Sequence, residues 1–390
     1  MSDAATRPTS LWADAEWRAV VAAFALNGML FGAWAARVPA FKERFDLEPG
    51  TLGLLLLALA AGAIASFPLA GALSERWGAP KLTTLCAWAY APALILLAFA
   101  PAPLALAVAL FLFGAMHGAM DVAMNGWGAQ VEKRTARSTM SVFHAMFSLG
   151  AGLGAASGFV AVRMGLAPEL HFTAVAFVGG AIALSAMISV KRSEKPLPAD
   201  GTSNPLVALP SGALFLVGII AFAISMGEGA MADWSAVFLR VAANATEAQA
   251  ALGYAAFSAT MVLTRLGGGM LVERFGPVVT VRASAATAFI GLTTAIVGQE
   301  VPAILFGFAL TGVGYAVVMP LVFSRAARDP DVPTGPAIAS VATLGYGGML
   351  LGPPVIGFIA QLTGMRLSFI ALAGLAILAA FLAPKLKVED

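Results

Sequence analysis

The chain has 390 residues, of which 59% are hydrophobic and only 11% are charged, with a net charge of +2. Soluble domains carry about 25% charged residues, so this composition cannot cover the surfaces of the soluble domains that such a length implies. The scattered basic residues exclude a nucleic-acid binder, and the single cysteine, Cys86, excludes an intrachain disulfide. The composition therefore indicates an integral membrane protein.

Twelve apolar runs of spanning length, about 20 residues each, follow one another along the chain. In the first half they are predicted at 18–39, 51–73, 82–100, 104–128, 140–163 and 171–190. In the second half they are predicted at 212–239, 250–272, 279–298, 302–324, 334–361 and 366–384. The first run also suggests a signal peptide cleaved after Ala35, but its length and the many runs that follow favour a first span.

The loop charges predict an orientation. An even number of spans places both termini on one side, and most of the 23 basic residues fall on that same side. Cytoplasmic loops carry the excess of Lys and Arg. We therefore expect a multi-pass protein of the bacterial-type inner (plasma) membrane with both termini in the cytoplasm.

A polar stretch rich in proline, serine and charge interrupts the apolar runs near the midpoint. It predicts an N-terminal six-helix bundle at 1–190, a cytoplasmic linker at 191–211 and a C-terminal six-helix bundle at 212–390. Each half contains matching segments at nearly constant offsets. The matched pairs are 71–80 with 269–277, Gly114 with Gly312, and 141–165 with 340–364. The chain is therefore predicted to be two six-helix halves in parallel orientation.

The repeated loop carries a family resemblance. Its pattern, Gly-x-Leu-x-acid-Arg-x-Gly, resembles the loop signature of the major facilitator superfamily, and 345–357 resembles the glycine-proline motif of that superfamily. Within the superfamily, 114–125 and 141–154 resemble the branch of fucose permeases and rhizopine transporters. The chain departs from the pattern by carrying Glu rather than Asp in both loops. It also lacks the arginine that proton-driven antiporters often carry early in span four, which disfavours a drug/proton antiporter.

The resemblance implies a central cavity surrounded by spans one, four, seven and ten, and a seam formed by spans two, five, eight and eleven. It also implies that the two loops form a cytoplasmic gate whose charges pair with helix ends and separate when the inside opens. The alternative is that these charges mark the membrane boundary. The gate residues are Gly71, Glu75, Arg76, Gly78, Glu273, Arg274 and Gly276.

Ionisable side chains inside spans are candidates for function, because burying them in hydrocarbon costs several kcal/mol. His117, Asp121 and Asn125 follow at intervals of four in span four, so they share one helical face. This face is expected to line the cavity, with Asp121 as a proton carrier. Alternatively, Asp121 is a fixed acceptor tied to His117 or Arg265.

Span seven contributes a second acid. Glu228 lies between two glycines near mid-membrane, where the backbone or a solute can approach closely. We expect Glu228 to be the second proton site. Asp233 follows near the outer end and is interpreted as a boundary residue that meets water.

Spans five and eight carry three further candidates. His144 and Ser148 share one face of span five, and a histidine there either contacts solute or proton or serves packing. Arg265 is the basic residue deepest in an apolar run. By the resemblance it should lie at the seam near His144 or Asp121, where it either binds an anionic solute or acts as a counter-ion.

Amide and aromatic groups complete the predicted solute site. Asn27 and Trp34 lie seven residues apart on span one, and Tyr315 matches His117 in the repeat. Trp34 and Trp234 are alternatively residues of the interfacial aromatic belt. The predicted solute contacts are Asn27, Trp34, His117, Asn125, His144, Ser148, Arg265 and Tyr315.

No nucleophile, metal-ligand or P-loop signature is found, so we expect the protein to be no enzyme and to bind no cofactor. We expect a proton to be the coupling ion. The glycines of 152–158 almost match a dinucleotide-binding loop, but inside a span they favour close helix packing. We expect a monomeric, proton-coupled secondary transporter of a small polar solute, with sugar or polyol favoured by the resemblance. The alternatives are an exporter of amphipathic metabolites or drugs by proton antiport, and a non-transporting receptor or assembly factor on the same fold.

Overall fold

The computed structural model describes residues 11–135, 139–190, 210, 212–332 and 334–387, and these contain helices and no strand. The first six spans are α1 (Ala15–Arg44), α2 (Pro49–Trp77), α3 (Ala79–Ala98), α4 (Pro103–Thr135), α5 (Met140–Arg163) and α6 (Pro168–Ile188). The others are α7 (Ala213–Ala243), α8 (Glu247–Val297), α9 (Val301–Tyr315), α10 (Val318–Ala326), α11 (Thr334–Thr363) and α12 (Met365–Leu382). Short 3₁₀ helices, η1 (Leu11–Ala13) and η2 (Ala383–Leu386), flank them.

Helix ends follow ordinary capping chemistry. The Asp14 side chain accepts a hydrogen bond from the Trp17 backbone at 3.1 Å and so caps α1. Thr246 and Gln249 form a reciprocal capping box at the start of α8. Proline lies in the first turn of α2, α3, α6 and α9, where its missing N–H costs no hydrogen bond.

The structure confirms an all-helical fold of twelve membrane spans, although three of them differ in their helix bounds from what the sequence predicts. α8 contains spans eight and nine, which meet at Gly276, whose φ of 74° interrupts the helix. Gly78, with φ of 86°, ends α2 at the equivalent place in the first half. Both positions lie in the left-handed region that glycine tolerates, so the glycines of the repeated loop turn the chain.

Span ten is broken, whereas the sequence predicts one continuous run. α9 ends at Tyr315, and α10 begins at Val318. Pro320 has no N–H to give to the Ala316 carbonyl four residues earlier. The Arg265 side chain supplies the missing donor, with its Nε 3.1 Å from the Ala316 oxygen.

Glycine contacts hold the spans of each half together, and they repeat between the halves. A Cβ added at Gly114 of α4 would overlap the Leu59 carbonyl of α2, and one added at Gly312 of α9 would overlap the Phe257 carbonyl of α8. These pairs occupy equivalent places in the repeat. Small residues let helices approach closely in a membrane. The structure thus gives the repeated glycines a packing role.

The same close packing occurs between the first and fifth spans of each half. A Cβ at Gly154 of α5 would overlap the Met29 carbonyl of α1, and one at Gly352 of α11 would lie 3.0 Å from the Met226 carbonyl of α7. Gly154 belongs to the stretch that almost matches a dinucleotide-binding loop, and here it packs against a neighbouring span, as the sequence favoured.

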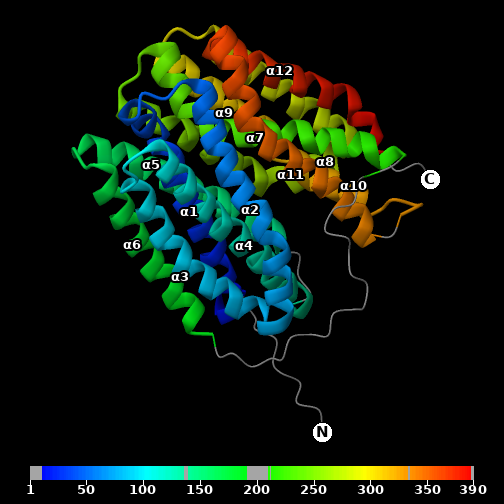
Figure 1. Ribbon diagram of the computed structural model, residues 1–390. Coiled ribbons are helices and arrows are strands. Elements are labelled where there is room, and N and C mark those ends of the chain that lie inside the picture. Colours follow the sequence, from blue (N-terminus) through cyan, green and yellow to red (C-terminus); the bar gives the residue numbers. More distant parts are fainter. Residues whose placement is uncertain (1–10, 136–138, 191–209, 211, 333, 388–390) are drawn as a thin grey trace.

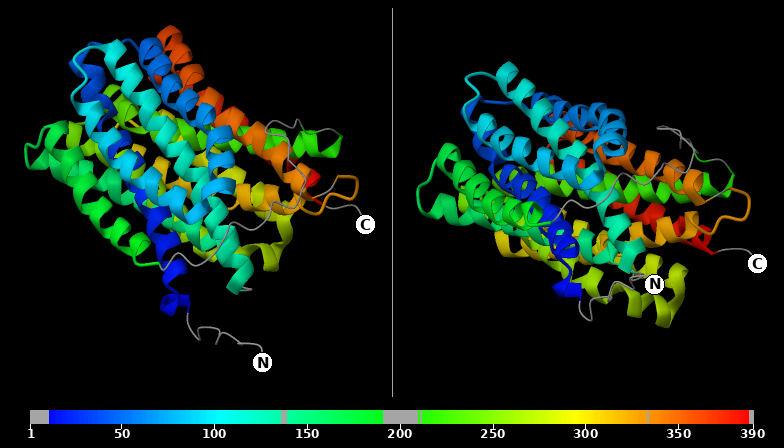
Figure 2. Two further views of the ribbon diagram at one scale, coloured as in Figure 1. Left: turned by 60° about the horizontal axis from the view of Figure 1, so that its bottom comes forward. Right: turned by 90° about the horizontal axis from the view of Figure 1, so that it is seen from below.

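The spans α1–α6 and α7–α12 form two groups of helices (Figure 1). We call the end with the start of α1 and the close of α12 the termini end, and the opposite end the far end. The groups meet around the α1–α2 connection at the far end and diverge toward the two chain termini (Figures 1 and 2). The linker predicted at 191–211 lies outside the described residues except for Pro210.

Candidate functional site

A cavity with a volume of about 260 Å³ lies between the two groups of helices. Its walls come from α1, α2, α4 and α5 on one side and from α7, α8, α10 and α11 on the other. Most of the wall is aromatic, aliphatic or methionine side chains. The charged or titratable lining residues are His117, Asp121, His144, Glu228, Asp233 and Arg265. A mainly apolar cavity with a few convergent polar groups is typical of a small-molecule site.

Asp121 faces this cavity from α4. Asn125, one turn further along the helix, donates to the Asp121 Oδ1 atom at 3.1 Å and to its backbone oxygen at 2.8 Å. Across the cavity, the Tyr346 hydroxyl of α11 lies 3.5 Å from Asp121 Oδ2. Both donors are neutral groups, so neither supplies a cation to the Asp121 carboxyl. Neither His117 nor Arg265 pairs with Asp121, so the alternative of a fixed acceptor tied to those residues finds no contact in the described part.

His117 lies one turn from Asp121 on the same helix. The Tyr90 hydroxyl of α3 lies 3.0 Å from its Nδ1 atom, and Phe31 of α1 stacks on its ring with centroids 5.2 Å apart. One ring nitrogen is therefore engaged within the first half, and the ring is held in a fixed orientation at the cavity wall. His144 of α5 lies near the Phe24 ring, with centroids 5.3 Å apart, and also lines the cavity.

Arg265 of α8 joins the two halves. Its Nη1 atom donates to the Ser148 hydroxyl of α5 at 2.7 Å, and its Nη2 atom lies 3.5 Å from the Glu228 carboxylate of α7. With its bond to the Ala316 carbonyl, the guanidinium has a partner on each edge. The sequence placed Arg265 at the seam near span five, and its contacts there are with Ser148 and Glu228. The guanidinium is thus already paired with an acid of the protein.

Asp233 lies within the cavity wall rather than at the membrane boundary that the sequence suggested. Its side chain belongs to α7 and lines the same cavity, and the residue is only 7% exposed. Its Oδ1 atom is buried and has no hydrogen-bond partner in the structure. The boundary interpretation rested on distance along the helix, whereas α7 is longer than the predicted span and its far end packs against the other half.

Four predicted solute contacts do not line this cavity. Asn27 is fully buried and donates to the His117 carbonyl at 3.3 Å, and Asn125 supports Asp121. Trp34 is fully buried against Phe41, with ring centroids 5.1 Å apart. Tyr315 is buried with its hydroxyl against Gly227, directly before the break in span ten.

Two tryptophans that the sequence alternatively assigned to the interfacial aromatic belt are buried instead. Neither Trp34 nor Trp234 forms part of an interfacial belt, because both are fully buried. The Trp234 indole donates to the Pro353 carbonyl at 3.2 Å and so ties α7 to α11. Both residues are packing elements of the far part of the bundle.

Several lining groups were not singled out from the sequence. They are polar side chains of α7, α8 and α11 and aromatic or methionine side chains on seven helices. Those that bring an oxygen or sulfur atom to the wall include Ser225, Tyr254, Ser258, Met319 and Tyr346. In a span that is apolar all round, periodicity does not distinguish the cavity face from the lipid face. The internal repeat offered one signal for the lining residues Tyr254 and Ser258, because they lie on span eight, the equivalent of span two in the first half.

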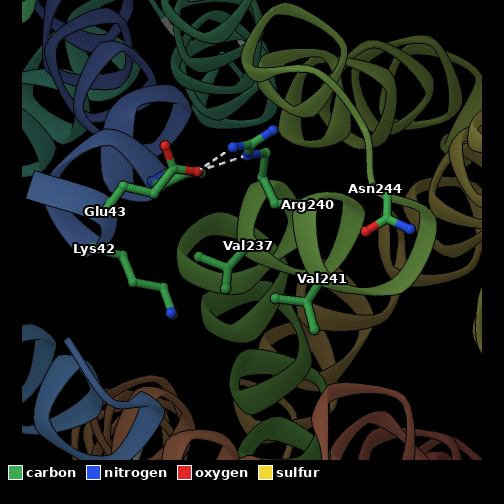
Figure 3. Close-up of a pocket in the computed structure, with 7 residues that line it drawn as sticks. Lys42, Glu43, Val237, Arg240, Val241 and Asn244 are labelled. Atoms are coloured by element: carbon green, nitrogen blue, oxygen red, sulfur yellow. Dashed lines mark hydrogen bonds and ion pairs between the residues drawn. The ribbon is translucent and has the colours of Figure 1, made fainter. Parts of the chain in front are cut away.

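The far end of the cavity is closed by contacts between the halves. Arg37 of α1 pairs with Glu247 of α8 at 3.1 Å. Glu43 of α1 pairs with Arg240 of α7 at the edge of a second, smaller pocket (Figure 3). A Cβ added at Gly357 of α11 would lie 2.7 Å from the Pro49 carbonyl of α2.

The predicted gate residues belong to the end of α2 and to the turn within α8, at the termini end, where the two groups of helices diverge (Figures 1 and 2). Arg76, Glu273 and Arg274 are exposed, and among the described residues none of them forms an ion pair. Arg274 lies over its neighbour Phe275 instead. The side chain of Glu75 lies outside the described part. This arrangement corresponds to a protein that is closed at the far end and open at the termini end.

The sequence was compared with known families and proteins. The profile of the Major Facilitator Superfamily matches residues 19–331 and 214–390. An uncharacterised transporter, y4wD, of Sinorhizobium fredii (strain NBRC 101917 / NGR234) is 44% identical over 372 residues, covering 95% of this chain and 98% of the relative. The membrane protein MosC of Rhizobium meliloti is 30% identical over 366 residues, covering 92% and 88%.

Solved structures share the fold at low sequence identity. A variant of the nucleoside transporter NupG has a TM-score of 0.75 at 12% identity, covering 96% of this chain and all of that one. A bacterial homologue of the human lysosomal transporter Spinster, inward-facing and occupied, has a TM-score of 0.72 at 15% identity, covering 94% and 95%. A D-xylose–proton symporter has a TM-score of 0.71 at 15% identity, covering 94% and 97%.

Proposed function

Since the chain belongs to the Major Facilitator Superfamily and is a membrane transporter of that family, we propose that it moves a small polar solute of sugar or polyol type by alternating access. The observation that carries this proposal is the cavity between the two halves, whose charged network connects them through Arg265, Glu228 and Ser148. It is no enzyme.

The alternating step follows from the contacts at the two ends. To open the far end, the protein must break the pairs Arg37–Glu247 and Glu43–Arg240. Closing the termini end brings the loops that end in Gly78 and Gly276 toward the other half. There Arg76, Glu273 and Arg274 find helix ends and opposite charges. With the termini in the cytoplasm of a bacterial-type inner membrane, the present state faces inward.

Proton coupling is assigned to Asp121 and Glu228. A ligand drives a two-state cycle only if it binds the two states unequally. Protonation of Glu228 removes the charge that holds Arg265, and so weakens a contact that crosses the halves through Ser148. Protonation of Asp121 changes its hydrogen bond with Tyr346 of the opposite half.

The lining groups suit a hydroxylated solute. His117, His144 and Ser148 offer hydrogen-bond atoms, while Phe31, Phe147 and Tyr254 offer flat apolar surface for the CH face of a sugar or polyol. The fold shared with a D-xylose–proton symporter is compatible with this class of solute. The site is complete within one chain, so we propose that a monomer transports. Asn27 and Asn125 support the wall from behind through their hydrogen bonds to His117 and Asp121.

A second candidate is an exporter of amphipathic metabolites by proton antiport. Four methionines, Met124, Met261, Met319 and Met349, line the cavity, and methionine-rich surfaces adapt to varied apolar ligands. Competition between a polyol panel and lipophilic cations for binding to the purified protein distinguishes the two candidates.

The proposed function is tested by uptake of labelled sugars and polyols into proteoliposomes with an imposed pH gradient. We expect accumulation that depends on the gradient, and loss of accumulation in Asp121→Asn and Glu228→Gln. Glu300→Gln, in the exposed connection between α8 and α9, is the matched control. Uptake that ignores the gradient and is unchanged in both variants would refute the proton roles.

A further inference from the structure

Asp233 is an acid of the cavity wall with one carboxyl oxygen that no described residue satisfies. The residue is only 7% exposed and therefore more than nine-tenths buried. Its Oδ1 atom has no hydrogen-bond partner among the described residues. Arg265, the one cation among the lining residues, is already held by Glu228, Ser148 and the Ala316 carbonyl. A buried charge without a partner is costly, so Asp233 marks a place where something else supplies the partner.

A backbone oxygen of α11 in the same wall lacks its regular helical donor. Pro353 has no N–H, so the Met349 carbonyl lacks the donor that a regular helix places four residues later. Met349 and Pro353 both line the cavity. The Met349 oxygen lies 3.1 Å from where a Cβ would stand on Gly229 of α7.

Asp233 and Gly229 are one turn apart on α7, so they share a face. Helical side chains lean toward the helix N-terminus and cover the turn before their own Cα. We therefore expect the Asp233 carboxyl to lie over Gly229, on the face that meets the Met349 oxygen. Because Gly229 has no side chain, α11 approaches the α7 backbone closely here, and no side chain of Gly229 stands between the carboxyl and the carbonyl.

The molecule already shows what such an oxygen does when a cation is near. In span ten, Pro320 removes the helical donor of the Ala316 carbonyl, and the Arg265 guanidinium takes its place at 3.1 Å. At α11 a proline again frees a carbonyl at the cavity wall. Within the described part of the chain, no cationic side chain is seen to take the place of the donor at this second carbonyl, and Asp233 lies one turn from the Gly229 that meets it.

We propose that Asp233 and the Met349 carbonyl form a subsite for a monovalent cation, occupied by an alkali metal ion or by the protonated amine of a solute. Carboxylate and freed helix carbonyls are the ligands with which broken transporter helices hold Na⁺, and they accept the N–H donors of an ammonium group equally well. The inference rests on the proposed transport function and refines it, because the subsite holds either the coupling ion or the charged end of the solute.

The test is thermal unfolding of the purified full chain in detergent at constant ionic strength. One arm compares NaCl with choline chloride, whose cation has no N–H donor. The other compares D-glucamine with D-sorbitol, which differ by one amine, both in choline chloride. We expect NaCl or D-glucamine to raise Tm by about 3 °C or more over its control. The arm that responds identifies the cation. No difference in either arm overturns the subsite.

Two variants tie the effect to this place. Asp233→Asn keeps the shape of the side chain and is expected to abolish the cation-dependent shift, whereas Glu300→Gln keeps it. Gly229→Ala fills the space before the Met349 oxygen and is expected to weaken the shift. Its matched control is Gly374→Ala on α12, where an added Cβ meets nothing within 4 Å. A shift that survives in Asp233→Asn overturns the subsite.

Failure of this inference is distinguishable from failure of the proposed function, because binding and transport are measured separately. Polyol uptake driven by a pH gradient without any cation effect on Tm contradicts the subsite alone. A cation effect that requires Asp233, in a protein that accumulates no sugar or polyol, supports the subsite and contradicts the choice of solute.

Discussion

In the first half of the molecule the cavity acid is held by its own helix, whereas in the second half the acids depend on partners elsewhere. Asp121 accepts from Asn125, one turn away on α4. Glu228 instead depends on Arg265 of α8, which reaches into the first half through Ser148, and Asp233 has no partner at all for one oxygen.

This difference determines how far the effect of protonating each acid extends through the molecule. A proton on Asp121 alters local hydrogen bonds and one contact at 3.5 Å with Tyr346. A proton on Glu228 alters an ion pair that shares its cation with the other half. We therefore expect substitutions in the second half to disturb stability and the balance of states, and those at Asp121 to disturb binding.

The largest effect is expected for Arg265→Ala. It leaves Glu228 without its cation inside the bundle, and breaking a buried pair costs about 3–5 kcal/mol. Thermal unfolding in detergent should show a lowered Tm, restored in part by the double variant with Glu228→Gln, because no uncompensated charge then remains. Arg328→Ala, on the exposed loop after α10, is the control. Equal loss in the single and double variants would contradict a counter-ion role.

Glycine packing offers a direct comparison between the halves. At Gly154 an added Cβ overlaps the Met29 carbonyl, whereas at Gly352, a glycine of α11 that packs on α7, it lies 3.0 Å from the Met226 carbonyl. Overpacking costs about 1–3 kcal/mol, so Gly154→Ala should lower Tm more than Gly352→Ala. Gly374→Ala is the neutral reference. A larger loss at Gly352 would show that α7 and α11 adapt less readily than α1 and α5.

Asp121→Asn is expected to act on the solute rather than on the fold. The amide keeps the shape of the carboxyl and remains able to bond Asn125, so Tm should change little. Asp121→Asn removes the charge-assisted hydrogen bond that we expect between the Asp121 carboxylate and a hydroxyl of the polyol. This loss should weaken polyol binding about tenfold, which corresponds to about 1.4 kcal/mol. Equilibrium binding of a labelled polyol measures this. A marked fall in Tm would mean that Asp121 supports structure as Arg265 does.

The smallest effect is expected at the far end. The Glu43 side chain is 53% exposed and that of Arg240 is 32% exposed, and exposed pairs contribute about 0.2–1 kcal/mol. Arg240→Ala should therefore leave Tm nearly unchanged but shift the balance toward the state open at the far end. Distances between spin labels on the two halves at this end, in a Cys86→Ser background, measure the shift. An unchanged distribution would assign the closure to Arg37–Glu247 and the glycine contacts.

Much of the fold was accessible from the sequence because its signals are local or repeated. Twelve apolar runs predict twelve spans, and the paired loops at Gly78 and Gly276 predict the turns that the structure shows. The break in span ten was missed. Pro320 was visible, but the guanidinium that compensates its missing donor lies on another helix.

The candidate site was accessible only in part. The cost of burying charge singled out Asp121, Glu228 and Arg265, and all three line the cavity. The same argument failed for Asp233, because position along a helix does not tell whether its end meets water or the other half. Helical spacing suggested Trp34 and the internal repeat suggested Tyr315, and neither residue lines the cavity.

The sequence by itself determined the membrane class, the twelve spans and the internal repeat, because hydrophobic burial and loop charge act residue by residue along the chain. Only the tertiary structure decided which face of each apolar helix looks into the cavity. It also decided which acid Arg265 neutralises and which is left without a cation. Those outcomes depend on where twelve helices cross, and the crossing points are set by contacts between residues far apart in the chain, such as Gly154 with Met29 and Trp234 with Pro353.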